Sequence, residues 1–134
     1  MAKLEAIEGI GDVYAGKLRA AGVRGTNDLL KKGSTKQGRQ ALAELAGVSE
    51  KLVLEWVNHA DLFRIKGIGP EYADLLEEAG VDTVVELAQR NPDNLYAKLV
   101  EVNKAKKLVR RLPTQNMVKA WIAQAKELPR IIQY

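Results

Sequence analysis

RIKGIGPEYADLLEEAGV, residues 64–81, repeats an earlier stretch of the chain, AIEGIGDVYAGKLRAAGV, residues 6–23. In both stretches an aliphatic run leads into Gly-Ile-Gly, an amphipathic segment follows, and a single glycine closes it. Each matched glycine lies 58 residues after its counterpart. Two glycines around one aliphatic residue favour a tight turn in which φ is positive and the backbone lies close to a neighbouring surface. The sequence therefore predicts a tandem repeat built on two glycine turns.

Each turn is expected to lead directly into a helix. Pro70 follows the second turn and suits the first helical position, because its fixed φ fits a helix and the N–H that it lacks would have no partner there. The next N–H groups at a helix start also lack partners within the helix, and the helix dipole makes this end positive. The turn and the helix start together predict a place where an anion binds.

The composition favours a small, entirely helical protein. Of the 134 residues, 46% are hydrophobic and only 5% are aromatic, and the β-branched residues are scattered among Ala, Leu, Glu and Lys, as is usual in helices. A chain of this length forms one domain or two small domains in close contact. We expect an all-α fold in which two repeats, residues 1–61 and 62–134, pack as a compact helical bundle.

The composition also argues against metal centres, membrane spans and the common catalytic motifs. There is no cysteine and only one histidine, His59, so we expect no disulfide, metal site or cofactor. No apolar run approaches the roughly 18 residues that span a bilayer and nothing resembles a signal peptide, so we expect a soluble, cytoplasmic protein with no membrane contact. No nucleotide-binding or metalloprotease motif is present, and we expect neither an enzyme nor a small-molecule substrate. His59 is interpreted as a partly exposed surface residue.

Periodicity and capping residues predict the other helices. The expected helix starts are residue 3, Asp12, Thr26 as an N-cap, Ser34 or Thr35, Ser49 with Glu50, Asp82 or Thr83, and the residues after Asn91-Pro92. The helix that ends at Gly47 is expected to bury an apolar stripe made of Leu42, Leu45 and Ala46. The irregular tail, residues 129–134, is expected to pack back onto the body through its Ile and Tyr side chains.

The net charge of +4 is concentrated in the second repeat. Residues 1–61 contain 9 Lys and Arg against 8 Asp and Glu, whereas residues 62–134 contain 12 against 9. One stretch, residues 98–111, holds cationic residues that are opposed only by Glu101: Lys98, Lys104, Lys106, Lys107, Arg110 and Arg111. Such a stretch is either a solvated helix face or a surface for a polyanion.

The same region contains an insertion. Ser49–Trp56 and Thr114–Trp121 have the same internal spacing but lie 65 residues apart, where the turns lie 58 apart. Seven residues have therefore been added around KAKKLVRRLP, which creates either an added contact surface or a looser helix connection. Aromatic side chains at matched positions are interpreted as packed within the bundle: Tyr14 and Tyr72 under the turns with exposed hydroxyls, and Trp56 and Trp121 as core anchors.

The two turns resemble the helix-hairpin-helix motif of DNA-binding proteins that do not read sequence, such as repair polymerases, glycosylases, ligases and Holliday-junction proteins. The resemblance rests on the Gly-Ile-Gly turns with Ala15 or Ala73 and Leu18 or Leu76 downstream, and it covers residues 4–32 and 62–90. Nearly the whole chain, including WVNHADLFRIKGIG, resembles a prokaryotic helix-hairpin-helix-containing family of unknown function. LAELAGVSEKLVLEW and VRRLPTQNMVKAW allow a reading as four such units, two of them degenerate.

The resemblance implies that the peptide N–H groups of each hairpin donate to consecutive DNA phosphates, supported by nearby basic side chains. In the second copy the matching residues are Gly67, Ile68 and Gly69 with Arg64 and Lys66, and in the first copy they are Gly9, Ile10 and Gly11 with Lys17. Lys104, Lys106, Lys107, Arg110 and Arg111 are expected to add to the contact. Backbone donors read no bases, so this binding would be independent of sequence and sensitive to salt.

Two functions remain open at this stage. Glu8 and Asp12 bracket the first turn and Glu71 follows the second, and carboxylates there repel phosphates. Lys66 offsets Glu71, so the second turn is the better candidate for DNA. The first function is a DNA-binding module that is accessory to repair or recombination. The second is a protein-interaction or scaffolding module in which both glycine turns serve close helix packing.

Overall fold

The computed structural model describes residues 2–134, which form helices and connecting loops without any strand. This confirms the expected all-α class. The chain divides into two compact units, Met1–Asp61 with Arg130–Tyr134, and Leu62–Pro129. The last five residues thus group with the first unit, whereas the sequence analysis assigned them to the second repeat. Within residues 2–134 no helix is both long and apolar enough to cross a bilayer.

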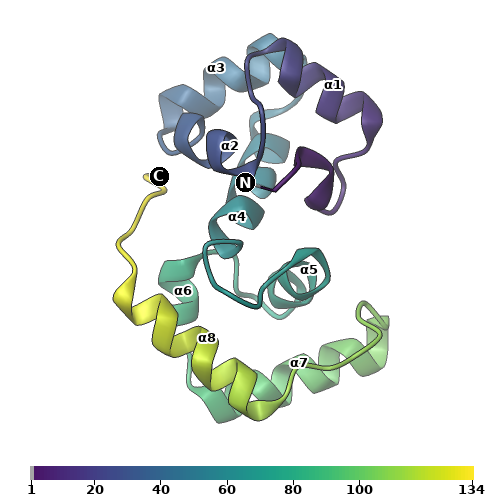
Figure 1. Ribbon diagram of the computed structural model, residues 1–134, viewed down its shortest axis with the longest axis vertical. Coiled ribbons are helices and arrows are strands. Elements are labelled where there is room, and N and C mark those ends of the chain that lie inside the picture. The colour runs from purple at the N-terminus through teal and green to yellow at the C-terminus, as the bar shows by residue number, and fades with distance from the viewer. Residues whose placement is uncertain (1) are drawn as a thin grey trace. The chain divides into compact units, whose positions relative to one another are not determined.

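The first unit surrounds a core formed by helices from its whole length. Its elements are a short 3₁₀ helix η1 (Leu4–Ala6), followed by α1 (Asp12–Ala20), α2 (Thr26–Lys32), α3 (Lys36–Ala46) and α4 (Glu50–Leu62), the last of which ends at the first residue of the second unit. α1 packs against η1 and α3, and α2 packs against α3 (Figure 1). The largest fully buried side chains of this unit are Leu4, Ile7, Leu18, Leu29 and Trp56.

The second unit contains α5 (Pro70–Glu78), α6 (Val84–Ala88), α7 (Pro92–Lys106) and α8 (Gln115–Glu127). α8 packs against both α6 and α7, and α5 packs against α7 (Figure 1). Their buried faces form one hydrophobic cluster whose largest members include Leu62, Ile65, Leu76, Leu87, Leu99 and Trp121. α8 is therefore the helix on which the rest of this unit is assembled.

The two copies of the repeated sequence have matching backbone geometry. Ile7 N–H donates to Leu4 O over 3.1 Å, and Ile65 N–H donates to Leu62 O over 3.1 Å. The glycines that the sequence marks for positive φ all adopt it: Gly9 at 92°, Gly67 at 94°, Gly22 at 94° and Gly80 at 92°. Backbone bonds and torsions thus recur 58 residues apart, as the glycine spacing predicts.

Most of the expected caps are present. The side chains of Thr35, Thr83, Asn91 and Thr114 accept N–H groups at the starts of α3, α6, α7 and α8. Thr26 is an exception, because Gly25 is the N-cap of α2 and Thr26 is its buried first residue. The insertion also has a defined position: residues 47–49 connect α3 to α4, whereas residues 107–114 connect α7 to α8.

Two predictions about burial were wrong. His59 is only 4% exposed, because it lies three residues after the buried Trp56 and therefore on the same side of α4. Leu45 is 69% exposed. The buried residues of α3 are Arg39, Leu42, Ala43 and Ala46, whose spacing of three and four defines a stripe that leaves Leu45 outside.

The C-terminal tail packs onto the first unit, as expected. Ile132 is 2% exposed, and Gln133 N–H donates to Ser34 O over 2.6 Å. Figure 1 shows the chain end beside α2, which Ser34 follows. Tyr134 remains 65% exposed. The tail is thus held by its backbone and by one buried isoleucine.

Two glycines of the first unit predict opposite responses to alanine. Gly16 lies inside α1 with nothing within 4 Å of an added Cβ, whereas a Cβ at Gly33 would lie 2.4 Å from Val57 Cγ2. We expect Gly16→Ala to stabilise the unit by about 0.5–1 kcal/mol and Gly33→Ala to destabilise it by about 1–3 kcal/mol. Chemical denaturation followed by Trp56 fluorescence, in a Trp121→Phe background, measures both. Equal effects of the two substitutions would contradict this packing.

Candidate nucleic-acid interface

The second Gly-Ile-Gly turn ends in a helix start without a side-chain cap. Gly69 is the N-cap of α5 and supplies no side-chain hydrogen bond, and Pro70 occupies the first turn. The first N–H to bond within the helix is that of Ala73, which donates to Gly69 O over 2.9 Å. The N–H groups of Glu71 and Tyr72 therefore belong to the free set at the positive end of the helix.

Only part of the turn's backbone is available to a ligand. Ile68 is 5% exposed, and its N–H donates to Ile65 O over 3.2 Å. This N–H is consequently used inside the turn, although the resemblance counted it as a phosphate donor. The N–H groups of Gly67 and Gly69 make no hydrogen bond within residues 2–134. A hollow of about 340 Å³ opens at this point, lined by Gly67, Gly69, Pro70, Glu71 and Tyr72.

Helix α8 fixes the position of the turn. The indole of Trp121 is 2% exposed, and a Cβ added to Gly67 would lie 3.0 Å from its Nε1. One turn of helix further on, the amide of Gln124 donates to Lys66 O over 3.2 Å and accepts from Lys66 N–H over 2.9 Å. The ring of Tyr72 lies 5.2 Å from that of Trp121 at 52°. These contacts hold the turn from both ends.

The basic insertion lies beside this turn. Arg110 Nη2 lies 3.5 Å from Glu71 Oε1, and the Tyr72 hydroxyl donates to Arg111 O over 3.0 Å. Lys106 forms an ion pair with Glu78 at the other end of α5. Residues 106–111 therefore run along α5. The carboxylate of Glu71, which argued against phosphate binding, has a guanidinium as its partner.

The other predicted basic residues have different surroundings. Arg64 is half-buried, and its Nη2 donates to Pro129 O over 2.7 Å, so this side chain holds the end of α8. Lys66 is exposed, and no ion pair of its ammonium is found among residues 2–134. Lys104 and Lys107 are exposed at the end of α7, where Lys107 adopts a left-handed conformation with φ of 51°.

The first turn has the same backbone but a different surface. Ile10 is buried and its N–H donates to Ile7 O over 3.1 Å, as at the second turn. Glu8 and Asp12 are exposed, and Val13, beside them, is 71% exposed. Around Gly9 and Gly11 no segment corresponds to residues 106–111. The structure thus brings basic residues to the second turn and leaves the first acidic.

The cations nearest the first turn are engaged elsewhere. Arg19 donates to both carboxylate oxygens of Glu5 over 2.7 and 3.1 Å. This guanidinium lowers the pKa of Glu5, chiefly through its hydrogen bond, so the carboxylate remains charged. Lys17 Nζ lies 5.8 Å from the centre of the Tyr14 ring, in a cation–π arrangement. Neither cation is paired with Glu8 or Asp12.

A family described as a domain of unknown function, DUF4332, matches residues 8–128. The chain belongs to this family. The match includes both Gly-Ile-Gly turns and extends over both units of the DUF4332 chain. No solved structure matches it.

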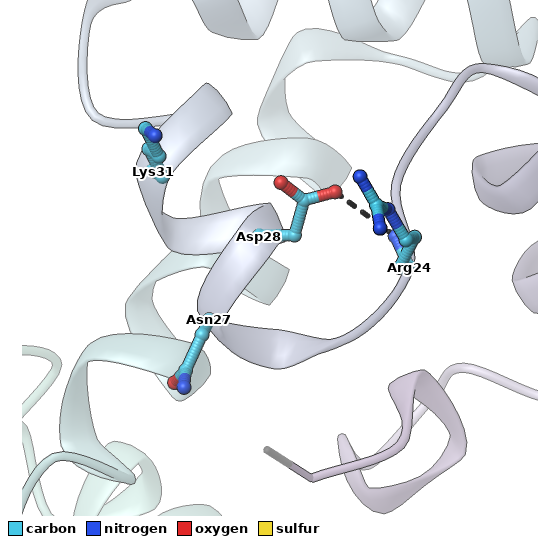
Figure 2. Close-up of a pocket in the computed structure, with 4 residues that line it drawn as sticks. All are labelled: Arg24, Asn27, Asp28 and Lys31. Carbon is cyan, nitrogen blue, oxygen red and sulfur yellow. Dashed lines mark hydrogen bonds between the residues drawn. The ribbon is translucent and has the colours of Figure 1, made fainter.

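A second hollow of the DUF4332 chain, about 300 Å³, lies at α2 and is lined by Arg24, Asn27, Asp28 and Lys31. Asp28 accepts the Arg24 N–H over 3.0 Å and pairs with Lys32. The Arg24 N–H, followed by Lys32, lowers the pKa of Asp28. Figure 2 shows that the Asn27 and Lys31 side chains point away from this pair. The polar groups therefore brace the loop before α2 and do not converge on a ligand.

The two turn glycines allow a matched test of the Trp121 contact. Gly9 and Gly67 share positive φ, but a Cβ at Gly9 meets nothing within 4 Å. We expect alanine to cost each unit about 1–3 kcal/mol through backbone strain, with a larger loss at Gly67 because its methyl would press on Trp121. Denaturation of each variant, followed by the Trp of its own unit after Trp→Phe substitution in the other, measures both losses. A larger loss at Gly9 would contradict the contact.

Proposed function

We propose that residues 4–32 and 62–90 form helix-hairpin-helix motifs, and that the second motif binds the backbone of duplex DNA without reading its bases. The observation that carries this proposal is the position of the basic insertion, whose Arg110 and Arg111 contact the first residues of α5. A role accessory to DNA repair or recombination follows from the resemblance to helix-hairpin-helix proteins.

The chemistry of the second turn suits a phosphate. Free N–H groups of Gly67, Gly69, Glu71 and Tyr72 surround a hollow at the positive end of α5, and such helix starts bind anions. Arg110, with its side chain 93% exposed, stands at the rim of this hollow. Guanidinium groups bind phosphate through paired N–H donors. Peptide donors and flexible cations together provide affinity without base recognition.

A different function is favoured for the first turn. Its exposed groups are the carboxylates of Glu8 and Asp12 and the aliphatic side chain of Val13. Acidic groups repel phosphates, whereas an exposed apolar side chain beside charged ones suits contact with a protein. The protein-interaction alternative is therefore proposed for the first unit, which leaves DNA to the second.

Salt-dependent binding tests the DNA proposal. We expect a short fluorescent duplex to bind with a Kd of roughly 10⁻⁴–10⁻⁶ M near physiological salt, as other non-specific complexes do. Three cations at the site, Lys66, Arg110 and Arg111, predict a slope of log K against log salt of about −3. Fluorescence anisotropy between about 50 and 200 mM salt measures it. The absence of binding at the lowest salt would refute the proposal.

A matched pair of charge variants locates the binding. Arg110→Gln with Arg111→Gln should reduce the magnitude of the slope by about 2. Lys3→Gln with Lys31→Gln removes the same charge from exposed positions of the first unit and should leave the slope nearly unchanged. Equal losses in both double variants would show a general effect of net charge and would exclude the second turn as the specific site.

The Tyr72 hydroxyl provides a third test. Tyr72→Phe keeps the ring beside Trp121 but removes the hydrogen bond to Arg111 O, so the basic segment is held less firmly. We expect the Kd for DNA to rise roughly two- to fivefold, or about 0.4–1 kcal/mol. Tyr14→Phe is the control, because the Tyr14 ring also lies beside a tryptophan, 5.1 Å away, but has no basic segment to hold. A similar rise in both variants would argue against this tether.

A further inference from the structure

The first unit contains a hollow that the proposed DNA site does not use. Its volume is about 350 Å³, and its lining consists of Lys36, Arg39, Glu50, Lys51, Leu54 and Tyr134. All of these residues belong to the first unit. The volume falls at the lower end of the range for small-molecule sites.

Arg39 is a buried cation without a counter-charge. It is 5% exposed, its Nη1 donates to Gly33 O over 2.8 Å, and its Nη2 donates to Gln133 O over 2.7 Å. No carboxylate forms an ion pair with it among residues 2–134. Buried charged groups in proteins are normally paired with an opposite charge. A guanidinium has five N–H donors, so Arg39 retains donors beyond the two that bind carbonyls.

Two lysines at helix starts add positive charge to the same hollow. Lys36 begins α3, whose cap Thr35 accepts the Gly38 N–H over 3.0 Å. Lys51 lies in the first turn of α4, where Ser49 accepts the Leu52 N–H over 3.1 Å. Both lysines are exposed, and neither forms an ion pair within the described chain.

The lining therefore has three cations and one carboxylate, that of Glu50. This excess favours an anion with more than one negative charge. The remaining wall is apolar and aromatic. The Tyr134 ring lies with its centre 5.9 Å from the Arg39 guanidinium carbon and is 65% exposed, while the Leu54 side chain is half-buried. An exposed ring beside a guanidinium offers a surface on which a planar group stacks.

We propose that this hollow binds a phosphate monoester that carries a planar ring. The phosphate contacts Arg39, Lys36 and Lys51, and the ring packs against Tyr134 and Leu54. This chemistry is shared by a free nucleoside monophosphate and by the terminal phosphate of a nucleic-acid strand. The proposal does not depend on DNA binding by the second unit, since it uses none of those residues.

Calorimetric titration of the full chain with adenosine monophosphate, adenosine and inorganic phosphate tests the site. We expect saturable binding of adenosine monophosphate with a Kd between about 10 μM and 1 mM. Adenosine, which lacks the charge, should bind at least about tenfold more weakly. Equal binding of adenosine, or no saturation by adenosine monophosphate within this range, would overturn the proposal.

Variants assign the binding to the hollow. Lys36→Gln with Lys51→Gln should weaken adenosine monophosphate about tenfold, while the control Lys3→Gln with Lys31→Gln leaves it unchanged. Tyr134→Ala should weaken adenosine monophosphate but not inorganic phosphate. Arg39 is left intact because it holds the C-terminal tail, and Trp56 fluorescence verifies that the variants fold. Unchanged affinity in the double lysine variant would refute the assignment.

Oligonucleotides distinguish the two sources of the phosphate. A short single strand with a 5′-phosphate is compared with the same strand without it, in the Arg110→Gln, Arg111→Gln background. Tighter binding of the phosphorylated strand than of adenosine monophosphate would identify a strand end as the ligand. Tighter binding of adenosine monophosphate would identify a free nucleotide. The background substitutions keep failure of the DNA proposal separate from failure of this one.

Discussion

The contact between the Trp121 indole and the Gly67 backbone determines the arrangement of the second unit. A side chain at Gly67 would approach Trp121 Nε1 to 3.0 Å, and the torsion there, φ of 94°, is one that L side chains rarely adopt. The same helix supplies Gln124, which binds both polar groups of the Lys66 peptide backbone. Because the turn is held in this way, α5 begins with uncapped N–H groups at a fixed place.

The first unit meets the same constraint with different surface chemistry. Its Tyr14 and Trp56 rings lie 5.1 Å apart at 56°, and those of Tyr72 and Trp121 lie 5.2 Å apart at 52°. The insertion in the second repeat leaves this ring pair unchanged, because its additional residues lengthen α7 and the connection after it. The packing of the turn is thus common to both units, while the charge beside it belongs to the second unit.

The sequence was a good guide where an interaction is local or periodic. Positive φ at Gly9 and Gly67, the cap at Thr35 and the burial of both tryptophans follow from spacing and residue type. Long-range contacts made by loops and polar side chains carry no such signal. The bonds of Tyr72 to Arg111 O and of Arg39 to Gln133 O join segments 39 and 94 residues apart, and no periodicity indicates them.

The errors of interpretation have related causes. His59 was judged by its polarity, but its place on α4 relative to Trp56 buries it. Ile68 was counted as a phosphate donor by resemblance, but its N–H closes the turn. In both cases the direction in which a group points decides its role, and composition does not reveal that direction.

The most direct test of phosphate binding by the second turn is an NMR titration of backbone amides with an unrelated DNA duplex. The account predicts that the amides of Gly69, Glu71 and Tyr72 shift strongly with DNA, whereas that of Ile68 shifts less because it is already bonded to Ile65 O. The matched amides of Gly11, Val13 and Tyr14 in the first unit should remain nearly unchanged and serve as an internal control. Shifts confined to the first turn, or spread over basic side chains without the amides of α5, would contradict it.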